Sequence, residues 1–359
     1  MLDNINMLKT EIRDYILNQL SEHPGDIASI TAKKFHVSRQ TTASYLNTLS
    51  KEGLVTANGR TRARKYELKK LVEQKYYEQI VPNMEEDVIW REKIYPFMGN
   101  LNANVVDICQ YGFTEMLRNV FDHSESEAVF FSVERNAVCV QLNVMDNGVG
   151  IFHKIQKDFH LSDSRHALLE LSKGKLTSDP KGHTGEGIFF TSRMFDSYCI
   201  LSEPLYYSRT SEDESDWLIE VGESNQKGTL ISMKISPYSK RTTQDVFNTY
   251  SPDKETYGFT KTHVPIQLAR YEGEQLVSRS QARRLLARFE RFSEVLLDFK
   301  GVKTIGQAFA DEIFRVYQLE HPATEILWVN TTQDVDNMIS RAKYNLEAPT
   351  KQLPLLPPP

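Results

Sequence analysis

A glutamate, an asparagine and a histidine recur at intervals of four residues within one segment that the sequence predicts to be helical. Glu115, Asn119 and His123 would share one face of a helix over residues 108–123, because residues four apart lie above one another in an α-helix. A carboxylate and a carboxamide aimed at one point suit a phosphate-bound Mg²⁺, which takes oxygen ligands and keeps several waters. Taken alone, the same spacing also describes a solvated helix face.

Two glycine-rich segments follow farther along the chain. Asp146 ends an alternating, strand-like segment over residues 138–146 and precedes Asn147-Gly148-Val149-Gly150-Ile151. The second segment, Gly182-His183-Thr184-Gly185-Glu186-Gly187-Ile188, opens a predicted helix that continues to Phe195. Glycines let backbone N–H groups approach a ligand where a Cβ would collide, and a helix N-terminus favours anions. Asp-Asn-Gly is also ordinary turn chemistry, so the order of the motifs carries the argument.

Four motifs in this order resemble the ATP-binding site of the GHKL superfamily, which includes gyrase, heat-shock chaperone, mismatch-repair and histidine-kinase ATP-binding domains. They are the segment with Glu115 and Asn119, the Asp146 loop, the second glycine segment and Gly228-Thr229. Within the superfamily the likeness is greatest to the anti-sigma-factor serine kinases, and it runs from about Asn102 to Pro237. The resemblance implies that the chain binds ATP and Mg²⁺.

The resemblance also implies a role for each motif residue. Asp146 would accept the exocyclic amine of adenine, Thr229 would support adenine through water, and Asn119 would bind Mg²⁺. Glu115 is the candidate general base that polarises the group attacking the γ-phosphate. The glycines would let the backbone approach the nucleotide and its phosphates: Gly148, Gly150, Gly182, Gly185 and Gly187. The polar segment over residues 152–181 resembles the mobile lid of the family.

The amino-terminal segment is basic, whereas the rest of the chain is acidic. Up to Lys70, 12 Lys and Arg stand against 7 Asp and Glu, a net charge of +5 in a chain of net charge −5, which leaves −10 for the remainder. Two short predicted helices are followed by a third with Ser38 as its expected N-cap. An Asn58-Gly59 turn between strand-like segments then predicts a hairpin. A basic module of this kind predicts a nucleic-acid partner.

Residues 3–70 therefore resemble a winged helix-turn-helix, in which the third helix enters the major groove and the wing contacts the backbone or minor groove. The base readers would be on the third helix: Arg39, Gln40, Thr41 and Thr42. The phosphate contacts would be on the wing: Arg60, Arg62 and Arg64. The alternative is a solvated basic face on a module that contacts protein.

The carboxy-terminal region alternates between predicted strands and helices, which indicates a small α/β layer. Its segment over residues 297–306 resembles the centre of STAS-like anti-anti-sigma domains, so a protein partner is expected here. Gly306-Gln307-Ala308-Phe309 stands where those proteins carry a phosphorylatable serine, and it offers no hydroxyl. This departure puts a phosphorylation switch in doubt.

The expected architecture is a multi-domain α+β chain with three folded parts. The folded parts are a winged helix-turn-helix over 1–72, a GHKL α/β sandwich over 101–237 and a STAS-like domain over 260–345. Linkers are expected over 73–100 and 238–259, and a proline-rich tail over 346–359. Three widely separated cysteines argue against disulfides or zinc, and no apolar run approaches the ~20 residues of a membrane span. We therefore expect a cytoplasmic protein with no membrane partner.

Three functions remain open on these observations. The leading hypothesis is an ATP-responsive, DNA-binding transcriptional regulator in which the nucleotide site controls how the domains associate. The second is an enzyme, either a Ser/Thr protein kinase acting on a partner or a slow ATPase, because Glu115 is retained. The third is a scaffold that binds nucleotide structurally. The sequence also leaves a homodimer open.

Overall fold

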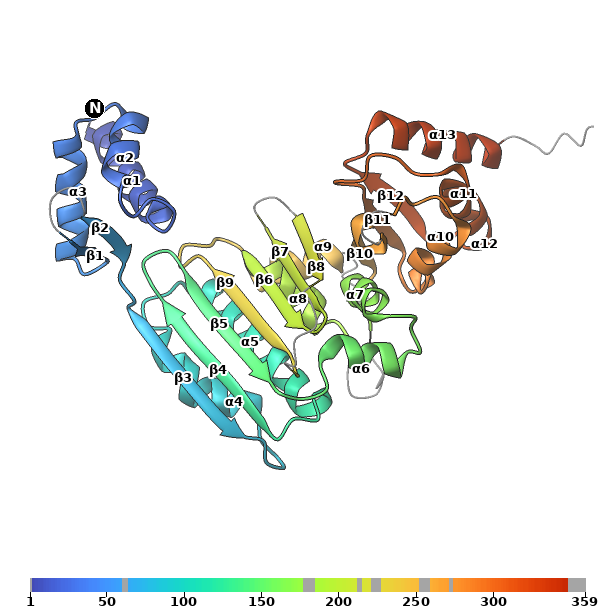
Figure 1. Cartoon of the computed structure of the whole chain (residues 1–359), viewed down its shortest axis with the longest axis horizontal. Helices are drawn as coiled ribbons and strands as arrows, with labels where there is room; N and C mark the ends of the chain where they lie inside the picture. The colour runs from blue at the N-terminus through green and yellow to red at the C-terminus, as the bar shows by residue number, and fades with distance from the viewer. Residues whose placement is uncertain are drawn as a thin grey trace, which may run out of the picture.

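The computed structural model confirms a mixed α+β chain, and it describes residues 2–59, 64–176, 185–211, 215–220, 227–251, 259–270 and 274–347. Figure 1 shows a small amino-terminal module at one corner of a large sheet and a carboxy-terminal α/β layer at the other side. Buried apolar side chains form two clusters. One joins the amino-terminal module to Ala137 and Val138 between β4 and β5, and the other runs continuously through the sheet and the carboxy-terminal layer.

The amino-terminal module contains three helices and a two-stranded antiparallel hairpin. Its elements are α1 (Leu2–Gln19), α2 (Ile27–Phe35), α3 (Arg39–Lys51), β1 (Val55–Asn58) and β2 (Lys65–Leu68). Ser38 is the N-cap of α3, where its side chain accepts a hydrogen bond from the Thr41 backbone N–H at 3.0 Å, as the sequence predicts. Ile16, Leu46 and other apolar side chains fill the space between the helices and are fully buried.

The central sheet has seven strands, and each neighbouring pair is antiparallel. In spatial order the strands are β3 (Val72–Gln79), β4 (Ala128–Arg135), β5 (Val140–Asp146), β9 (Leu230–Ile235), β6 (Ser197–Ser202), β7 (Leu205–Thr210) and β8 (Ser215–Glu220). Burial alternates along β5, as expected for a strand with one face against a core. Figure 1 shows the helices gathered behind this sheet.

Both segments expected as linkers contain ordered elements that join the central domain. Residues 73–100 supply β3, α4 (Glu86–Ile89), a π-helical turn (Trp90–Ile94) and a 3₁₀ turn (Tyr95–Phe97). Trp90 and Ile94 from these turns are buried beside α5 (Ala103–His123). Residues 238–259 supply α9 (Thr243–Tyr250), which packs on α5 and α8 (Gly187–Met194). These residues therefore belong to the core of the sheet domain.

The segment expected as a lid forms two helices within its described part. They are α6 (Ile151–Asp158) and α7 (Ser164–Lys173), which pack on each other. The side chains from Ala167 to Lys173 are all buried, although the segment looks polar in sequence. α7 packs against α8 and against β10 (Lys261–Pro265), and these contacts explain the burial. Figure 1 shows α7 between the central sheet and the carboxy-terminal layer.

The carboxy-terminal layer is built on a parallel sheet of three strands in the order β10, β11 (Glu294–Asp298) and β12 (Glu325–Val329). Its other elements are a 3₁₀ turn (Ile266–Ala269), α10 (Arg279–Leu286), a second 3₁₀ turn (Phe289–Arg291), α11 (Gln307–Asp311), a π-helical turn (Glu312–Tyr317), α12 (Gln318–Glu320) and α13 (Gln333–Glu347). This alternation of strands and helices agrees with the α/β layer that the sequence predicts. Most of the proline-rich tail lies outside the described residues.

Candidate nucleotide site and its surroundings

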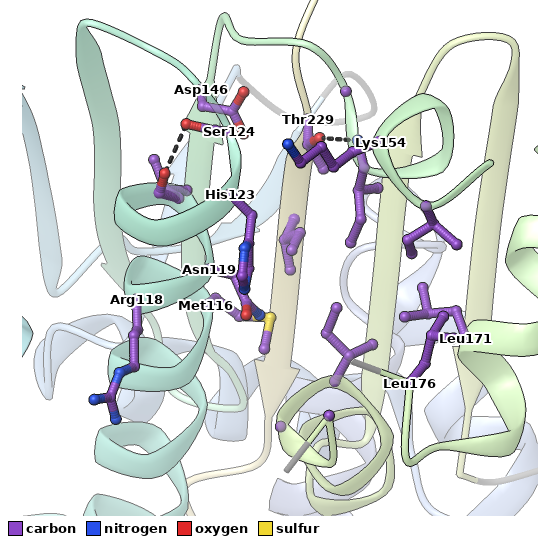
Figure 2. Close-up of a pocket in the computed structure, with 18 of the residues that line it drawn as sticks. Met116, Arg118, Asn119, His123, Ser124, Asp146, Lys154, Leu171, Leu176 and Thr229 are labelled. Atoms are coloured by element: carbon purple, nitrogen blue, oxygen red, sulfur yellow. Dashed lines mark hydrogen bonds between the residues drawn. The ribbon is translucent and has the colours of Figure 1, made fainter. Parts of the chain in front are cut away.

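A cavity of about 270 Å³ lies between α5, the loop after β5, the lid helices and the start of α8 (Figure 2). Its polar lining comes from Glu115, Arg118, Asn119, His123, Ser124, Asp146, Lys154, Asp158 and Thr229. Its apolar lining comes from Met116, Val120, Ile151, Ile155, Phe159, Leu171, Leu176, Ile188 and Ile231. Apolar walls with a few convergent polar groups are typical of small-molecule sites. The four motifs that the sequence analysis singled out thus meet at one cavity.

Asp146 lies at the end of β5 and is only 5% exposed. Its carboxylate Oδ1 accepts a hydrogen bond from the Gly148 backbone N–H at 2.8 Å. Burial raises the pKa of this carboxyl, although the backbone N–H groups of Gly148 and Thr229 act in the opposite direction. A buried carboxylate held in a fixed direction can select a ligand that donates hydrogen bonds, such as an exocyclic amine.

Gly148 occupies a place where a larger residue would not fit. A Cβ at this position would lie 1.9 Å from the backbone carbonyl oxygen of Ser124, at the end of α5. The Val149 backbone N–H donates to the same carbonyl at 2.9 Å. The loop after Asp146 is therefore fastened to α5, so that Asp146 and the polar face of this helix keep a fixed relation.

Glu115 and Asn119 reach the cavity from successive turns of α5, together with His123. Figure 2 shows Asn119 and His123 directed from the helix toward the cavity. Glu115 lies against the first residue of α8, because a Cβ on Gly187 would come within 2.0 Å of its Oε2. Glycine at position 187 therefore allows a carboxylate to approach the N-terminus of α8, which is also where a phosphate would be favoured.

Thr229 is buried on the opposite wall and organises the start of α6. Its Oγ1 accepts a hydrogen bond from the Ile151 backbone N–H at 3.0 Å (Figure 2). Ser202 Oγ donates to the Gly228 carbonyl at 3.0 Å, which fixes the preceding residue. Gly150 and Gly185 also line the cavity, whereas Gly182 lies outside the described residues.

Two cations at the cavity were missed by the sequence analysis. Lys154 Nζ contacts Glu125 Oε1 at 2.9 Å and Asp158 Oδ2 at 3.9 Å. Arg118 Nε lies 3.7 Å from Asp122 Oδ2, and its side chain is about half exposed. Arg118 directly precedes Asn119, and Lys154 lies one turn into the helix after Gly150. Their closeness in sequence to these motif residues could have identified both as cavity residues. Both cations belong to the cavity lining, and each has an acidic partner nearby.

The far side of lid helix α7 contains a buried ion cluster shared with the carboxy-terminal layer. Lys173 and Glu170 are each 1% exposed, and Lys173 Nζ lies 2.6 Å from Glu170 Oε1. Lys173 Nζ also donates to the Ala287 carbonyl at 2.9 Å, and Arg288 lies 3.3 Å from Glu170 Oε2. Burial lowers the pKa of Lys173. Burial also acts to raise the pKa of Glu170, but Lys173, His166 and Arg288 together hold it below its usual value.

Hydrogen bonds on either side of the ion cluster extend this contact. Thr262 Oγ1 donates to the Lys173 carbonyl at 2.7 Å. Lys175 Nζ donates to the Arg291 carbonyl at 2.9 Å, and Arg291 returns a bond to the Lys175 carbonyl at 3.1 Å. Leu171 and Leu176 from the same segment line the cavity. One short segment thus forms a cavity wall and a buried contact with the carboxy-terminal layer.

The proposed DNA-reading residues of α3 separate into two groups. Arg39, Gln40 and Thr41 are exposed, and Arg39 also donates to Ser29 Oγ at 3.0 Å. Thr42 is fully buried, so its expected role as a base reader is wrong. Its side chain turns inward because it lies one position beyond the exposed first turn, on the face that contacts the module core. Residue type alone does not report this orientation.

The wing is described only in part. Arg64 is exposed, and its guanidinium lies 5.1 Å from the centre of the Tyr66 ring. Arg60 and Arg62 lie outside the described residues. Arg64 and the exposed first turn of α3 are therefore the described parts of the expected DNA-binding surface.

Comparison with known proteins identifies one part of the chain. Residues 281–336, which run from α10 into α13, match a family model described as a STAS-like domain of unknown function (DUF4325). No curated protein matches the chain. None of the helices in the described part of the chain has the length and apolar character that a bilayer crossing requires. The carboxy-terminal α/β layer of this protein therefore contains a STAS-like domain.

Proposed function

We propose that the chain is an ATP-responsive, DNA-binding regulator in which nucleotide in the cavity controls how the STAS-like domain and the DNA-binding module associate with the central domain. One observation carries the proposal. The lid segment lines the cavity with Leu171 and Leu176 and, through Lys173, makes a buried contact with the STAS-like domain. A ligand that changes the packing of α7 on the cavity would therefore act on that contact.

The nucleotide part of the proposal rests on the chemistry of the cavity and on the resemblance to the GHKL superfamily. Asp146 would accept the adenine amine, and the N-terminus of α8 would receive phosphate. Asn119 supplies a suitable oxygen for Mg²⁺ on the same helix as Glu115. In the described residues, no group of three His, Cys, Asp or Glu could hold a metal alone. Phosphate oxygens and waters would therefore complete the ion's coordination, as is usual for Mg²⁺ bound with nucleotide.

The DNA part of the proposal rests on the arrangement of α1, α2, α3 and the β1–β2 hairpin, which fits a winged helix-turn-helix. Arg39, Gln40 and Thr41 lie on the exposed first turn of α3, where such modules contact base edges. We expect salt-sensitive binding to duplex DNA, measured by fluorescence anisotropy at several salt concentrations, because bound phosphates release counterions. Absence of salt-sensitive binding to any duplex would contradict the DNA-binding part.

A second function, phosphoryl transfer or hydrolysis, is favoured by one contact. Glu115 lies at the N-terminus of α8, where a general base would meet a group attacking the terminal phosphate. A Ser/Thr protein kinase of the anti-sigma-factor type and a slow ATPase both use such a base. They are distinguished by whether label from the γ-phosphate appears on protein or as free phosphate.

Variants of Glu115 and Asn119 separate these functions. If Glu115 orients a nucleophile, Glu115→Ala should bind Mg-ATP nearly normally while losing turnover. Asn119→Ala should lose the part of the ATP affinity that depends on Mg²⁺, because an oxygen ligand is removed. Calorimetry with and without Mg²⁺, combined with a phosphate-release assay, measures both effects. Equal loss of binding in the two variants would show that Glu115 is structural, and no turnover in the wild type would favour the regulator without catalysis.

A further inference from the structure

The central sheet has one face that no described element covers. The helices lie on its other face, and Figure 1 shows the strands in front of them. Alternate residues of β5 are buried toward the helices, while Gln141, Asn143 and Met145 point the other way and remain partly exposed. The same alternation runs along β6 and β7, so among the described residues this face of the sheet carries partly exposed side chains, and we call it the open face.

The strand register places a large apolar side chain at the same level in every strand of this open face. The row runs through Tyr77 (β3), Phe130 (β4), Met145 (β5), Leu230 (β9), Leu201 (β6), Tyr206 (β7) and Ile219 (β8), each paired directly with the next. We call these seven residues the apolar row. Tyr77 is 68% exposed, Phe130 37% and Ile219 52%. With strands ~4.8 Å apart, the row is about 29 Å long.

The neighbouring level of the sheet is polar but uncharged over five consecutive strands. It contains Ser132, Asn143, Ser232, Cys199 and Ser208. Asn143 Nδ2 donates to Ser132 Oγ at 2.9 Å. Gln141 Nε2, from the next level, donates to Asn143 Oδ1 at 3.0 Å and to Ser232 Oγ at 3.1 Å. Ser132, Asn143, Ser232 and Gln141 thus bond to one another, so these four can be covered at little cost in unpaired hydrogen bonds.

Charges on this face are mixed in sign: Lys75 lies on the edge strand β3 at the level of Ser132, and Lys234 lies on β9 opposite Gln141, two levels from the apolar row. Glu73 contacts Lys70 at 2.8 Å and Lys75 at 3.2 Å. Glu134 lies 3.4 Å from the same Lys70 Nζ. A surface with an uncharged centre and balanced charges at its border does not repel a copy of itself, although the chain as a whole has a net charge of −5.

We propose that the open face of the central sheet is the interface between two copies of this chain, packed through their apolar rows about a two-fold axis. A row of about 29 Å and a face about 20 Å deep, the length of six strand residues, give a contact of roughly 600 Å² in projection. Stable interfaces bury about 800 Å² of accessible surface per partner, so the projected area of this face is of the same order. Two sheets meeting in this way form a sandwich with aligned strands.

The dimer does not depend on nucleotide or DNA, but it would give the DNA-binding module a partner. A two-fold axis through the sheets relates the two amino-terminal modules, as required to read two half-sites. Only one patch is used, and it is the same on both copies, so the contact closes as a dimer and does not extend into a filament.

The test is the mass of the full chain in solution, measured by light scattering after size exclusion and by sedimentation equilibrium at micromolar concentration. The wild type should be a dimer. Leu201→Asp should be monomeric, because two like charges would be brought into one apolar interface. Leu319→Asp is the matched control, since Leu319 is 62% exposed on α12, outside the sheet, and this variant should remain a dimer.

A mixing experiment distinguishes loss of the interface from misfolding of the variants. Leu201→Asp and Leu201→Lys should each be monomeric, and an equimolar mixture should form a heterodimer because the opposite charges attract. Only folded variants can show this rescue, and their circular dichroism should match that of the wild type. A monomeric wild type, a dimeric Leu201→Asp, or folded variants that do not associate on mixing would each overturn the proposal. A monomer whose apolar row fails to bind a hydrophobic dye would show that the chain covers this face itself.

Discussion

Asp146→Asn is expected to reduce the affinity for Mg-ATP roughly 5- to 150-fold, because spoiling a buried hydrogen-bonding pair costs about 1–3 kcal/mol. Asp146 is 5% exposed, and its carboxylate direction is fixed by the Gly148 N–H. The carboxylate only accepts hydrogen bonds, whereas an asparagine amide also presents two N–H donors. If the amide nitrogen turned toward the ligand, a donor would face the adenine amine. Isothermal titration calorimetry on the full chain measures the change.

Asp158→Asn provides the matched control for this experiment. Asp158 lines the same cavity but lies 3.9 Å from Lys154, with 24% of its side chain exposed, so it has water as an alternative partner. The control should therefore alter ATP affinity much less. Undiminished ATP affinity in Asp146→Asn, or an equal loss in both variants, would contradict the assignment of Asp146 to adenine.

Lys173→Met is expected to destabilise the contact between the lid and the STAS-like domain by about 3–5 kcal/mol, because it leaves the Glu170 carboxylate buried without its closest cation. Arg288, 3.3 Å from the other carboxylate oxygen, compensates only in part. Thermal unfolding should shift downward, and hydrogen exchange should rise in α7 and in the segment around Ala287. Both quantities are measured on the full chain without nucleotide.

Two further variants identify the cause of this effect. Lys261→Met removes a cation that lies 2.7 Å from Glu294, but 32% of the Lys261 side chain is exposed, so its cost should stay within about 1 kcal/mol. The double variant Lys173→Met with Glu170→Met should regain much of the loss, because neither charge is then buried alone. A Lys173→Met protein as stable as the wild type would show that the ion cluster does not hold the lid.

The elements that the sequence predicted well are those with strong local signals. The period of the apolar residues indicated the helix that became α5, and Ser38 marked the start of α3 through its capping chemistry. The strand β5 alternates clearly, since its inner face packs against α5. The motif order then placed Glu115, Asn119, Asp146 and Thr229 at one cavity, because each motif occurs at the end or on the face of a regular element.

The elements that were missed depend on partners distant in the chain. β3 resembles a polar linker in sequence because it is an edge strand with mostly exposed side chains, and its pairing with β4 connects residues 49 to 63 positions apart. The lid helix α7 buries Glu170 and Lys173 against a domain that begins about ninety residues later. The burial of Thr42 is likewise a matter of packing. Local composition cannot report such contacts.

The central claim is that nucleotide in the cavity changes the affinity of the chain for DNA, and linkage supplies its most direct test. Fluorescence anisotropy with a duplex from the gene's own locus gives the Kd for DNA with and without saturating Mg-ATP, and calorimetry gives the Kd for ATP with and without the duplex. The account predicts that each ligand changes the affinity for the other by the same factor. A Kd for DNA that is identical with and without Mg-ATP would contradict it.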